Sequence, residues 1–461
     1  MHWRQLWLCL ALMVNGGSAA PPPNIIHIIG DDVGYDDLSC FGAKDIHTPN
    51  LDRLASEGMK FTSFYAPSPV CTASRAALLT GCYAQRVSLP NVLFPFSREG
   101  LNSNEITIAE LLKTRGYATA VVGKWHLGHQ PQFLPPSHGF DLYFGIPYPN
   151  DHGPERLGHA KSQGDPNFRL PPIPLIRGTN VVETPAQLAT LPERFTEEAI
   201  RFVEANRDRP FYLHLANVET HTPWLVPARF HYKSKAGVYG DAVQSLDWTV
   251  GEVMRTLDRL GLATNTLVVF TSDNGPLVKR YPELEGIYGH AAAVQTNRVH
   301  LLRDGKYQAA YEGGTRVAAL MRWPGKIPAG SVCHELVAGF DLFTTFAKLA
   351  DAAIPTDRII DGKDISALMF GDKSAPGPHD AFYYYQGFQL AAVRSGKWKL
   401  VFGNPIALYD LESDIGETTS RAKEHPDVIK RLQAVADKAR ADLGDARQKL
   451  PGQNRRPPGK L

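Results

Sequence analysis

One segment of the sequence combines a cysteine with a cation at the start of an expected helix. Pro67 and Pro69 open a loop, and residues 71–80 have a helix-forming composition. Cys71 therefore falls at a helix N-terminus, where unpaired backbone N–H groups and the helix dipole favour an anion. Arg75 lies one helical turn further along, over the same point. The pattern indicates an activated nucleophile or, equally, a small residue packed at the start of a helix.

Other reactive side chains follow apolar stretches that we expect to be strands. Residues 25–29 are β-branched and almost continuously apolar, which suits a strand buried on both faces of a parallel sheet. Further polar side chains follow other expected strands: Asp31 with Asp32, Lys124 with His126, His221, and Asp273 with Asn274. The carboxyl ends of parallel strands meet at one edge of a sheet, so we expect these side chains to gather there.

The acidic members of this set offer ligands for a metal ion. Asp31, Asp32, Asp273 and Asn274 provide oxygen donors only. Such a set suits calcium or magnesium better than a metal that prefers thiolate or imidazole. Adjacent carboxylates also favour a cation between them. The sequence does not distinguish between the two ions.

The elements that must position these side chains alternate between strands and helices. This alternation predicts an α/β fold with a mostly parallel central sheet flanked by helices. A strand is expected at 59–65, and helices are expected at 107–116, 196–206 and 241–260. Residues 131–192 are rich in Pro, Gly and polar side chains, so we expect long loops that rim the site.

The pattern changes near residue 371, which divides the chain into two domains. We expect a catalytic domain at 21–371 and a smaller subdomain at 372–450, in which short antiparallel strands are backed by a helix from 426 to about 443. The tail, 451–461, carries Arg455 and Arg456 and is predicted to be disordered.

Composition limits the possible partners and the compartment. Charged residues make up 21% of the 461 residues and the net charge is +2, so we expect no nucleic-acid partner. Residues 1–20 combine an early positive charge, a short apolar core and a small-residue end, which predicts a secretory signal peptide and export to the periplasm or the extracellular space. Later stretches are too short to span a bilayer, which needs about 20 apolar residues.

The cysteines are too few for a disulfide framework. Removal of the signal peptide leaves Cys40, Cys71, Cys82 and Cys333. This number is small for an exported protein of this size. Their pairing cannot be deduced from the sequence.

Two motifs resemble the signatures of the sulfatase family. The segment Cys71-Thr-Ala-Ser-Arg75, followed by Ala-Ala-Leu-Leu-Thr-Gly, resembles the first signature, in which Cys-x-Pro-Ser-Arg is converted to formylglycine; Ala73 stands where the family usually has proline. The segment from Gly116 to His126 resembles the second signature without a mismatch. The resemblance extends from Asn24 to the Leu-Tyr-Asp-Leu segment at Leu408, and it is strongest to the branch of arylsulfatase A and N-acetylgalactosamine-6-sulfatase.

The resemblance implies a fold and a set of roles. It implies an alkaline-phosphatase-like fold, a formylglycine made from Cys71 by a formylglycine-generating enzyme, and a sulfate ester substrate, with sulfated carbohydrates expected. Calcium would be held by Asp31, Asp32, Asp273, Asn274 and the oxygen of modified Cys71. Arg75 and Lys124 would stabilise the formylglycine, and His126 would take a proton from its hydrate. His221 and Lys306 would grip the sulfate and protonate the departing oxygen.

Two alternatives have different chemistry. A phosphomonoester or phosphodiester hydrolase of the alkaline phosphatase superfamily could use the same scaffold, although such enzymes commonly have a Thr or Ser nucleophile and more metal-binding His and Asp residues. A non-catalytic sugar-binding relative is expected to have lost Cys71, Arg75 or His126, and the sequence retains all three.

Overall fold

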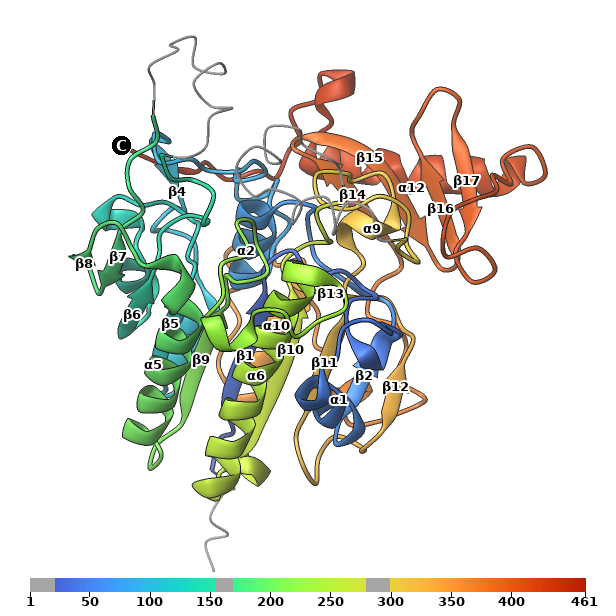
Figure 1. Cartoon of the computed structure of the whole chain (residues 1–461). Coiled ribbons are helices and arrows are strands. Elements are labelled where there is room, and N and C mark those ends of the chain that lie inside the picture. Colours follow the sequence, from blue (N-terminus) through green and yellow to red (C-terminus); the bar gives the residue numbers. More distant parts are fainter. Residues whose placement is uncertain (1–20, 155–168, 279–298) are drawn as a thin grey trace, which may run out of the picture.

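The computed structural model describes residues 21–154, 169–278 and 299–461 (Figure 1). The expected signal peptide, 1–20, lies outside these residues. Within the described part of the chain, none of the helices is both long enough and apolar enough to cross a membrane.

A ten-stranded sheet forms the centre of the large domain. Its strands are β1 (Asn24–Gly30), β2 (Met59–Phe61), β5 (Ala118–Gly123), β6 (Leu142–Gly145), β7 (Leu175–Arg177), β8 (Asn180–Glu183), β9 (Phe211–Ala216), β10 (Thr266–Ser272), β11 (Ala319–Arg322) and β12 (Ser331–Cys333). They lie in the order β12-β2-β11-β10-β1-β9-β5-β6-β7-β8. The central strands β10, β1, β9, β5 and β6 are mutually parallel, as predicted.

Helices cover both faces of this sheet. The helices α1 (Pro49–Ser56), α5 (Leu191–Ala205) and α6 (Gly237–Arg259) pack in one hydrophobic cluster, and α2 (Cys71–Thr80), α3 (Ile108–Lys113) and α10 (Asp341–Leu349) pack in another. Alternate residues of β1 enter the two clusters, Ile25 and Ile29 in one and Ile26 and Ile28 in the other. The expected strand buried on both faces is therefore confirmed.

The second sheet is small and antiparallel, as the sequence predicts. It contains β14 (Phe382–Gln386), β15 (Gln389–Ser395), β16 (Trp398–Val401) and β17 (Ala407–Asp410) in sequential order. The helix α12 (Pro426–Leu443) contributes its buried side chains to the core of this sheet. Figure 1 shows the sheet to one side of the large domain, next to the short helix α9 (Glu312–Thr315).

The single strand expected at 59–65 is two strands in different sheets. β2 belongs to the large sheet, whereas β3 (Phe64–Tyr65) pairs with β13 (Val337–Ala338). The chain bends between them, and the Thr62 carbonyl accepts hydrogen bonds from the Arg316 guanidinium at 2.8 and 2.6 Å. A tertiary contact therefore interrupts a stretch whose composition alone favours one strand.

The region 131–192 contains more regular structure than the expected loops. The strands β6, β7 and β8 extend the large sheet from this region. The helix predicted at 196–206 starts earlier, at Leu191, because Pro192 is compatible with the first helical turn.

The prediction that the tail is disordered is wrong. β18 (Gly459–Lys460) pairs with β4 (Glu99–Gly100), and the Arg456 guanidinium forms two contacts of 2.7 and 2.8 Å with the Glu105 carboxylate. The positive charge that suggested a solvated tail is instead neutralised by a buried acidic partner.

Candidate active site

The predicted site residues meet at one edge of the large sheet. Asp31 and Asp32 follow β1, Lys124 follows β5, and Asp273 follows β10. His221 lies in the loop after β9, and Cys71 begins α2 as expected. All six side chains are buried. The backbone is left-handed at Asp32 (φ 64°) and at His126 (φ 62°), a conformation that non-glycine residues adopt mainly where the surroundings impose it.

Four of these side chains could share one cation. One potential ligand atom from each of Asp31, Asp32, Cys71 and His221 lies within 4.8 Å of the others. The Oδ1 atoms of Asp31 and Asn274 are buried and receive no hydrogen bond from any residue that the structure describes. Burying an acceptor without a donor is costly, and a cation would satisfy both oxygens. The residues present therefore fit a hard, oxygen-binding divalent ion.

Three buried cations neutralise the three site carboxylates. The pairs are Lys124 Nζ with Asp31 Oδ2 at 2.6 Å, Lys306 Nζ with Asp32 Oδ2 at 2.7 Å, and Arg75 Nη2 with Asp273 Oδ2 at 2.8 Å. A divalent cation added to this balanced set would leave the site positive. A positive, buried site attracts an anionic substrate.

As at Asp32, whose oxygens accept from Asn274 and Lys306, protein donors already engage both oxygens of Asp273. Oδ2 accepts from Arg75, and Oδ1 accepts from the backbone N–H of Asp32 at 3.2 Å. Burial and the negative charge of Asp31 raise the pKa of Asp273 to about 6. Asp273 thus lies beside the group of four residues described above rather than within it.

The Cys71 thiol is not set up as a thiolate. Burial raises its pKa to about 11, although the nearby Lys124 and Lys306 ammonium groups act in the opposite direction. The thiolate is the nucleophilic form of cysteine, so unmodified Cys71 is protonated near neutral pH and is a weak nucleophile.

His126 has a free nitrogen suited to accepting a proton. Its Nε2 lies 2.9 Å from the Leu93 carbonyl oxygen, which can only accept, so Nε2 must carry the hydrogen. Burial and the Lys124 charge hold the pKa of His126 well below its usual value, so the ring is neutral. Nδ1 then carries a lone pair, and within the described residues it has no hydrogen-bond partner.

His221 and Lys306 form a linked pair. His221 Nδ1 donates to the Thr222 carbonyl at 2.7 Å, which leaves Nε2 to accept from Lys306 Nζ at 2.9 Å. Burial alone would lower the pKa of Lys306, but the Asp32 carboxylate holds it well above its usual value. Lys306 therefore remains charged while it contacts both Asp32 and His221.

Comparison with known proteins assigns the family. The family described as Sulfatase matches residues 23–352, and the family described as N-sulphoglucosamine sulphohydrolase, C-terminal, matches residues 304–442. The chain belongs to the sulfatase family. It is a sulfuric ester hydrolase.

Individual relatives are similar over most of their length. Human arylsulfatase A is 39% identical over 94% of this chain and 90% of its own length, and N-acetylgalactosamine-6-sulfatase from Canis lupus familiaris is 39% identical over 87% and 75%. The crystal structure of Ps i-CgsB in complex with k-i-k-neocarrahexaose has a TM-score of 0.76 and 31% identity, and the match covers 90% of this chain and 92% of that one.

Two residues at the site of this sulfatase were not predicted individually. Asp151 Oδ1 lies 3.9 Å from His221 Nδ1, and the His152 ring stacks on Phe94 with centroids 4.6 Å apart. His152 also lies edge-on to His126, at 5.6 Å between centroids. Both belong to the region expected to form rim loops. The only local signal is that an acidic residue and a histidine are adjacent after Pro149.

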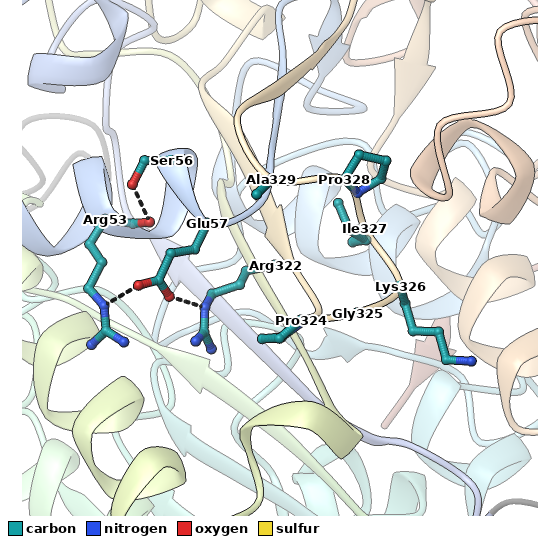
Figure 2. Close-up of a pocket in the computed structure, with 10 residues that line it drawn as sticks. All are labelled: Arg53, Ser56, Glu57, Arg322, Pro324, Gly325, Lys326, Ile327, Pro328 and Ala329. Carbon is teal, nitrogen blue, oxygen red and sulfur yellow. Dashed lines mark hydrogen bonds and ion pairs between the residues drawn. The ribbon is translucent and has the colours of Figure 1, made fainter.

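A pocket of about 730 Å³ lies at the opposite edge of the sheet and contains none of the predicted site residues (Figure 2). Its lining includes the end of α1 and Arg322, which pairs with Val268 near the start of β10. The Glu57 carboxylate in this lining forms 2.7 Å ion pairs with both Arg53 and Arg322. The charge of Glu57 is therefore already paired, which indicates a structural role for this carboxylate.

Proposed function

We propose that this sulfatase hydrolyses sulfate esters of carbohydrates, with a formylglycine made from Cys71 as nucleophile and a calcium ion as cofactor. The observation that carries the proposal is the position of Cys71, whose sulfur lies within 4.8 Å of ligand atoms of Asp31, Asp32 and His221. The high pKa of the thiol supports modification, because cysteine in this environment is a poor nucleophile.

The names of similar proteins support a carbohydrate substrate. One relative is an N-acetylgalactosamine-6-sulfatase, and one similar structure contains the oligosaccharide k-i-k-neocarrahexaose.

The proposed calcium site consists of Asp31, Asp32, Asn274 and the oxygen at modified position 71, with Asp273 beside them. The two acceptor oxygens without described donors, Oδ1 of Asp31 and Oδ1 of Asn274, favour this assignment. Bound calcium supplies positive charge that neutralises the sulfate oxygens. Magnesium offers the same charge and prefers the same oxygen donors.

Buried cations lie close enough to position 71 to act on its side chain, among them Lys124 and Lys306. Formylglycine supplies an aldehyde hydrate, one hydroxyl of which attacks sulfur while the other allows sulfate to leave afterwards. Arg75 and Lys124 hold this position electrostatically, since both are buried and paired with Asp273 and Asp31. The neutral His126 ring accepts the proton from the attacking hydroxyl at Nδ1.

Lys306 and His221 act on the sulfate and the leaving group. The Lys306 ammonium remains charged and binds a sulfate oxygen. His221 Nε2 accepts a hydrogen bond from the same ammonium at 2.9 Å, so His221 holds Lys306 in place and the proton for the departing alcohol oxygen comes from Lys306.

Maturation and export complete the proposal. A formylglycine-generating enzyme would act on the segment around Cys71, in which Ala73 replaces the usual proline. The signal-like sequence of residues 1–20 supports export to the periplasm or the extracellular space.

The mass of the peptide containing Cys71 tests the modification directly. Conversion of the thiol to the aldehyde lowers the mass by about 18 units. We expect this loss in active protein, and Cys71→Ala should abolish sulfate release from an aryl sulfate while the protein still unfolds cooperatively. An unmodified thiol in fully active protein would refute the nucleophile.

Chelation tests the metal and the reaction class. We expect EGTA to remove activity toward an aryl sulfate and calcium to restore it, with magnesium titrated in parallel. Faster hydrolysis of the matching aryl phosphate would favour the phosphoester hydrolase instead. Activity that survives complete removal of divalent ions would exclude the cofactor.

A further inference from the structure

A second cluster of buried charges lies where the large domain meets the C-terminal sheet. This junction cluster consists of Glu312 at the start of α9, Arg316 after it, Arg394 on β15, Lys399 on β16, and Glu417 beyond β17. All five side chains are buried, and Glu312, Lys399 and Glu417 have no exposed surface. Figure 1 shows α9 beside the sheet that carries Arg394 and Lys399.

Glu312 is the centre of the cluster. Its Oε1 accepts from Tyr384 Oη at 2.7 Å and from Lys399 Nζ at 3.0 Å. Its Oε2 accepts from Tyr65 Oη at 2.5 Å and from Arg316 Nη1 at 3.3 Å. Glu312 thus joins the C-terminal sheet to Tyr65, which lies on the strand that leads toward Cys71.

Lys399 bridges two carboxylates. Its Nζ lies 3.0 Å from Glu312 and 2.9 Å from Glu417, and Glu417 Oε2 accepts the backbone N–H of Glu312 at 2.7 Å. Removal of Lys399 would leave these carboxylates buried without their shared counter-charge. A buried carboxylate that loses its counter-charge either moves or takes up a proton.

Glu312 is connected to Lys306 through two glycines. The Gly313 N–H donates to the Arg303 carbonyl at 2.9 Å. A Cβ added to Gly314 would lie 2.1 Å from the Gln308 carbonyl oxygen and 3.0 Å from that of Gly305. The backbone on both sides of Lys306 therefore rests against the residues that directly follow Glu312.

The C-terminal sheet also contacts the Lys306 segment directly. Arg303 Nη1 donates to the Glu417 carbonyl at 3.0 Å, and the Ala309 N–H donates to Gln386 Oε1 at 3.2 Å. Within this segment Tyr307 has a left-handed backbone, with φ 67°. A non-glycine residue keeps that conformation only where its surroundings hold it.

We propose that Lys399 and Glu312 are positioning residues through which the C-terminal sheet holds Lys306 against the sulfate group of the substrate. The inference rests on the proposed function, in which Lys306 binds sulfate. Lys399 is not a catalytic residue, because its contacts are with Glu312 and Glu417.

A double-mutant cycle tests the inference. The variants are Lys399→Met, Lys306→Met and the double variant, and the measurements are kcat and KM for an aryl sulfate and inhibition by inorganic sulfate. We expect Lys399→Met to raise KM and to weaken sulfate inhibition by about tenfold or more, because displacing a binding group by about 1 Å has large effects. In the Lys306→Met background, Lys399→Met should change KM and sulfate inhibition little further.

Lys397→Met is the matched control. Lys397 is two residues away and pairs with Asp410 at 2.7 Å, but its side chain is 41% exposed, against 0% for Lys399. We expect its KM and sulfate inhibition to match those of the wild type. An equal effect of Lys397→Met would overturn the inference.

Tyr384→Phe provides a milder test should Lys399→Met fold poorly. It removes the Tyr384 hydroxyl that donates to Glu312, with little change in side-chain volume. We expect a smaller rise in KM, which again disappears in the Lys306→Met background. If the effects of Lys399→Met and Lys306→Met on KM multiply in the double variant, the two residues act independently. That result would overturn this inference but not the proposed role of Lys306. Full activity of Lys306→Met would overturn the proposed role of Lys306 as well.

Discussion

Two buried charge clusters in the described part of the chain look alike in composition and differ in how fully they are paired. At the sheet edge, Asp31 and Asn274 each retain an oxygen without a described donor. In the junction cluster, Glu312 accepts two hydrogen bonds or ion pairs at each carboxylate oxygen. The sheet-edge cluster therefore has acceptor oxygens that a ligand could occupy, whereas the oxygens of Glu312 in the junction cluster are already engaged.

This difference distinguishes a binding site from a charge cluster with a structural role. Burying charges costs free energy that only complete pairing offsets, so incomplete pairing persists where a ligand completes it. In the junction cluster Glu417 Oε1 makes no hydrogen bond but lies 2.9 Å from the Lys399 ammonium, so every carboxylate oxygen there faces a donor or a cation. This pairing fixes one relative placement of the segments that it joins. Burial and charge alone would not have distinguished the two clusters.

Asp31→Asn should break the sheet-edge cluster and produce the largest effect. We expect kcat/KM to fall by about 10³-fold, because the variant loses a charged ligand of the proposed calcium ion and the partner of Lys124. Calcium should also cease to raise the melting temperature, since a ligand stabilises only a protein that binds it. Steady-state kinetics and thermal unfolding with and without calcium measure both effects.

Glu57→Gln is the control for that experiment. Glu57 is an ion-paired carboxylate at the opposite edge of the same sheet (Figure 2). Its activity should remain within about twofold of the wild type, because its charge pairs only with neighbouring arginines. A comparable loss of activity would mean that any paired carboxylate of this sheet matters for catalysis.

Glu312→Gln should reduce stability while leaving the calcium response intact. We expect the free energy of unfolding to fall by about 3 kcal/mol, because Lys399 and Arg316 lose a buried counter-charge. Calcium should still raise the melting temperature by the wild-type amount. Loss of that response would show that the two clusters are one cooperative unit.

Glu417→Gln should change how stability depends on pH. Burial and the neighbouring Glu312 charge raise the pKa of Glu417 to about 7 in the folded protein, although Lys399 opposes them. Between its unfolded pKa and about pH 7 the folded state binds more protons, so this group lowers stability as pH rises. The variant should therefore gain about 3 kcal/mol relative to the wild type across that range. Chemical denaturation at pH 5 and pH 8 measures the free energy of unfolding of both proteins. The same difference between variant and wild type at both pH values would contradict the prediction.

Arg456→Gln should have the smallest effect, because its ion pair is peripheral. Its side chain is 24% exposed, and it pairs with Glu105. We expect a loss of about 1 kcal/mol and activity within twofold of the wild type. A larger loss of stability would show that docking of the tail contributes as much as the junction cluster.

Much of the site could be predicted because its residues are marked by local patterns. Asp31 and Asp32 directly follow a buried apolar strand, and Cys71 begins a helix whose composition is evident. The central strands were predictable for the same reason, since periodicity and apolar runs are properties of neighbouring residues. The ordered tail was not, because the partner of Arg456 lies 351 positions away.

The sequence by itself determined which chemical groups lie at the carboxyl edge of the sheet, because strand direction and strand ends are set by short-range pattern. Only the tertiary structure decided how those groups are paired. It assigned Arg75 to Asp273, left oxygens of Asp31 and Asn274 without described donors, and joined Glu312 to Lys399. Charge pairing in a buried site depends on distances of a few ångströms between segments far apart in the chain, and those distances are fixed only when the whole core packs.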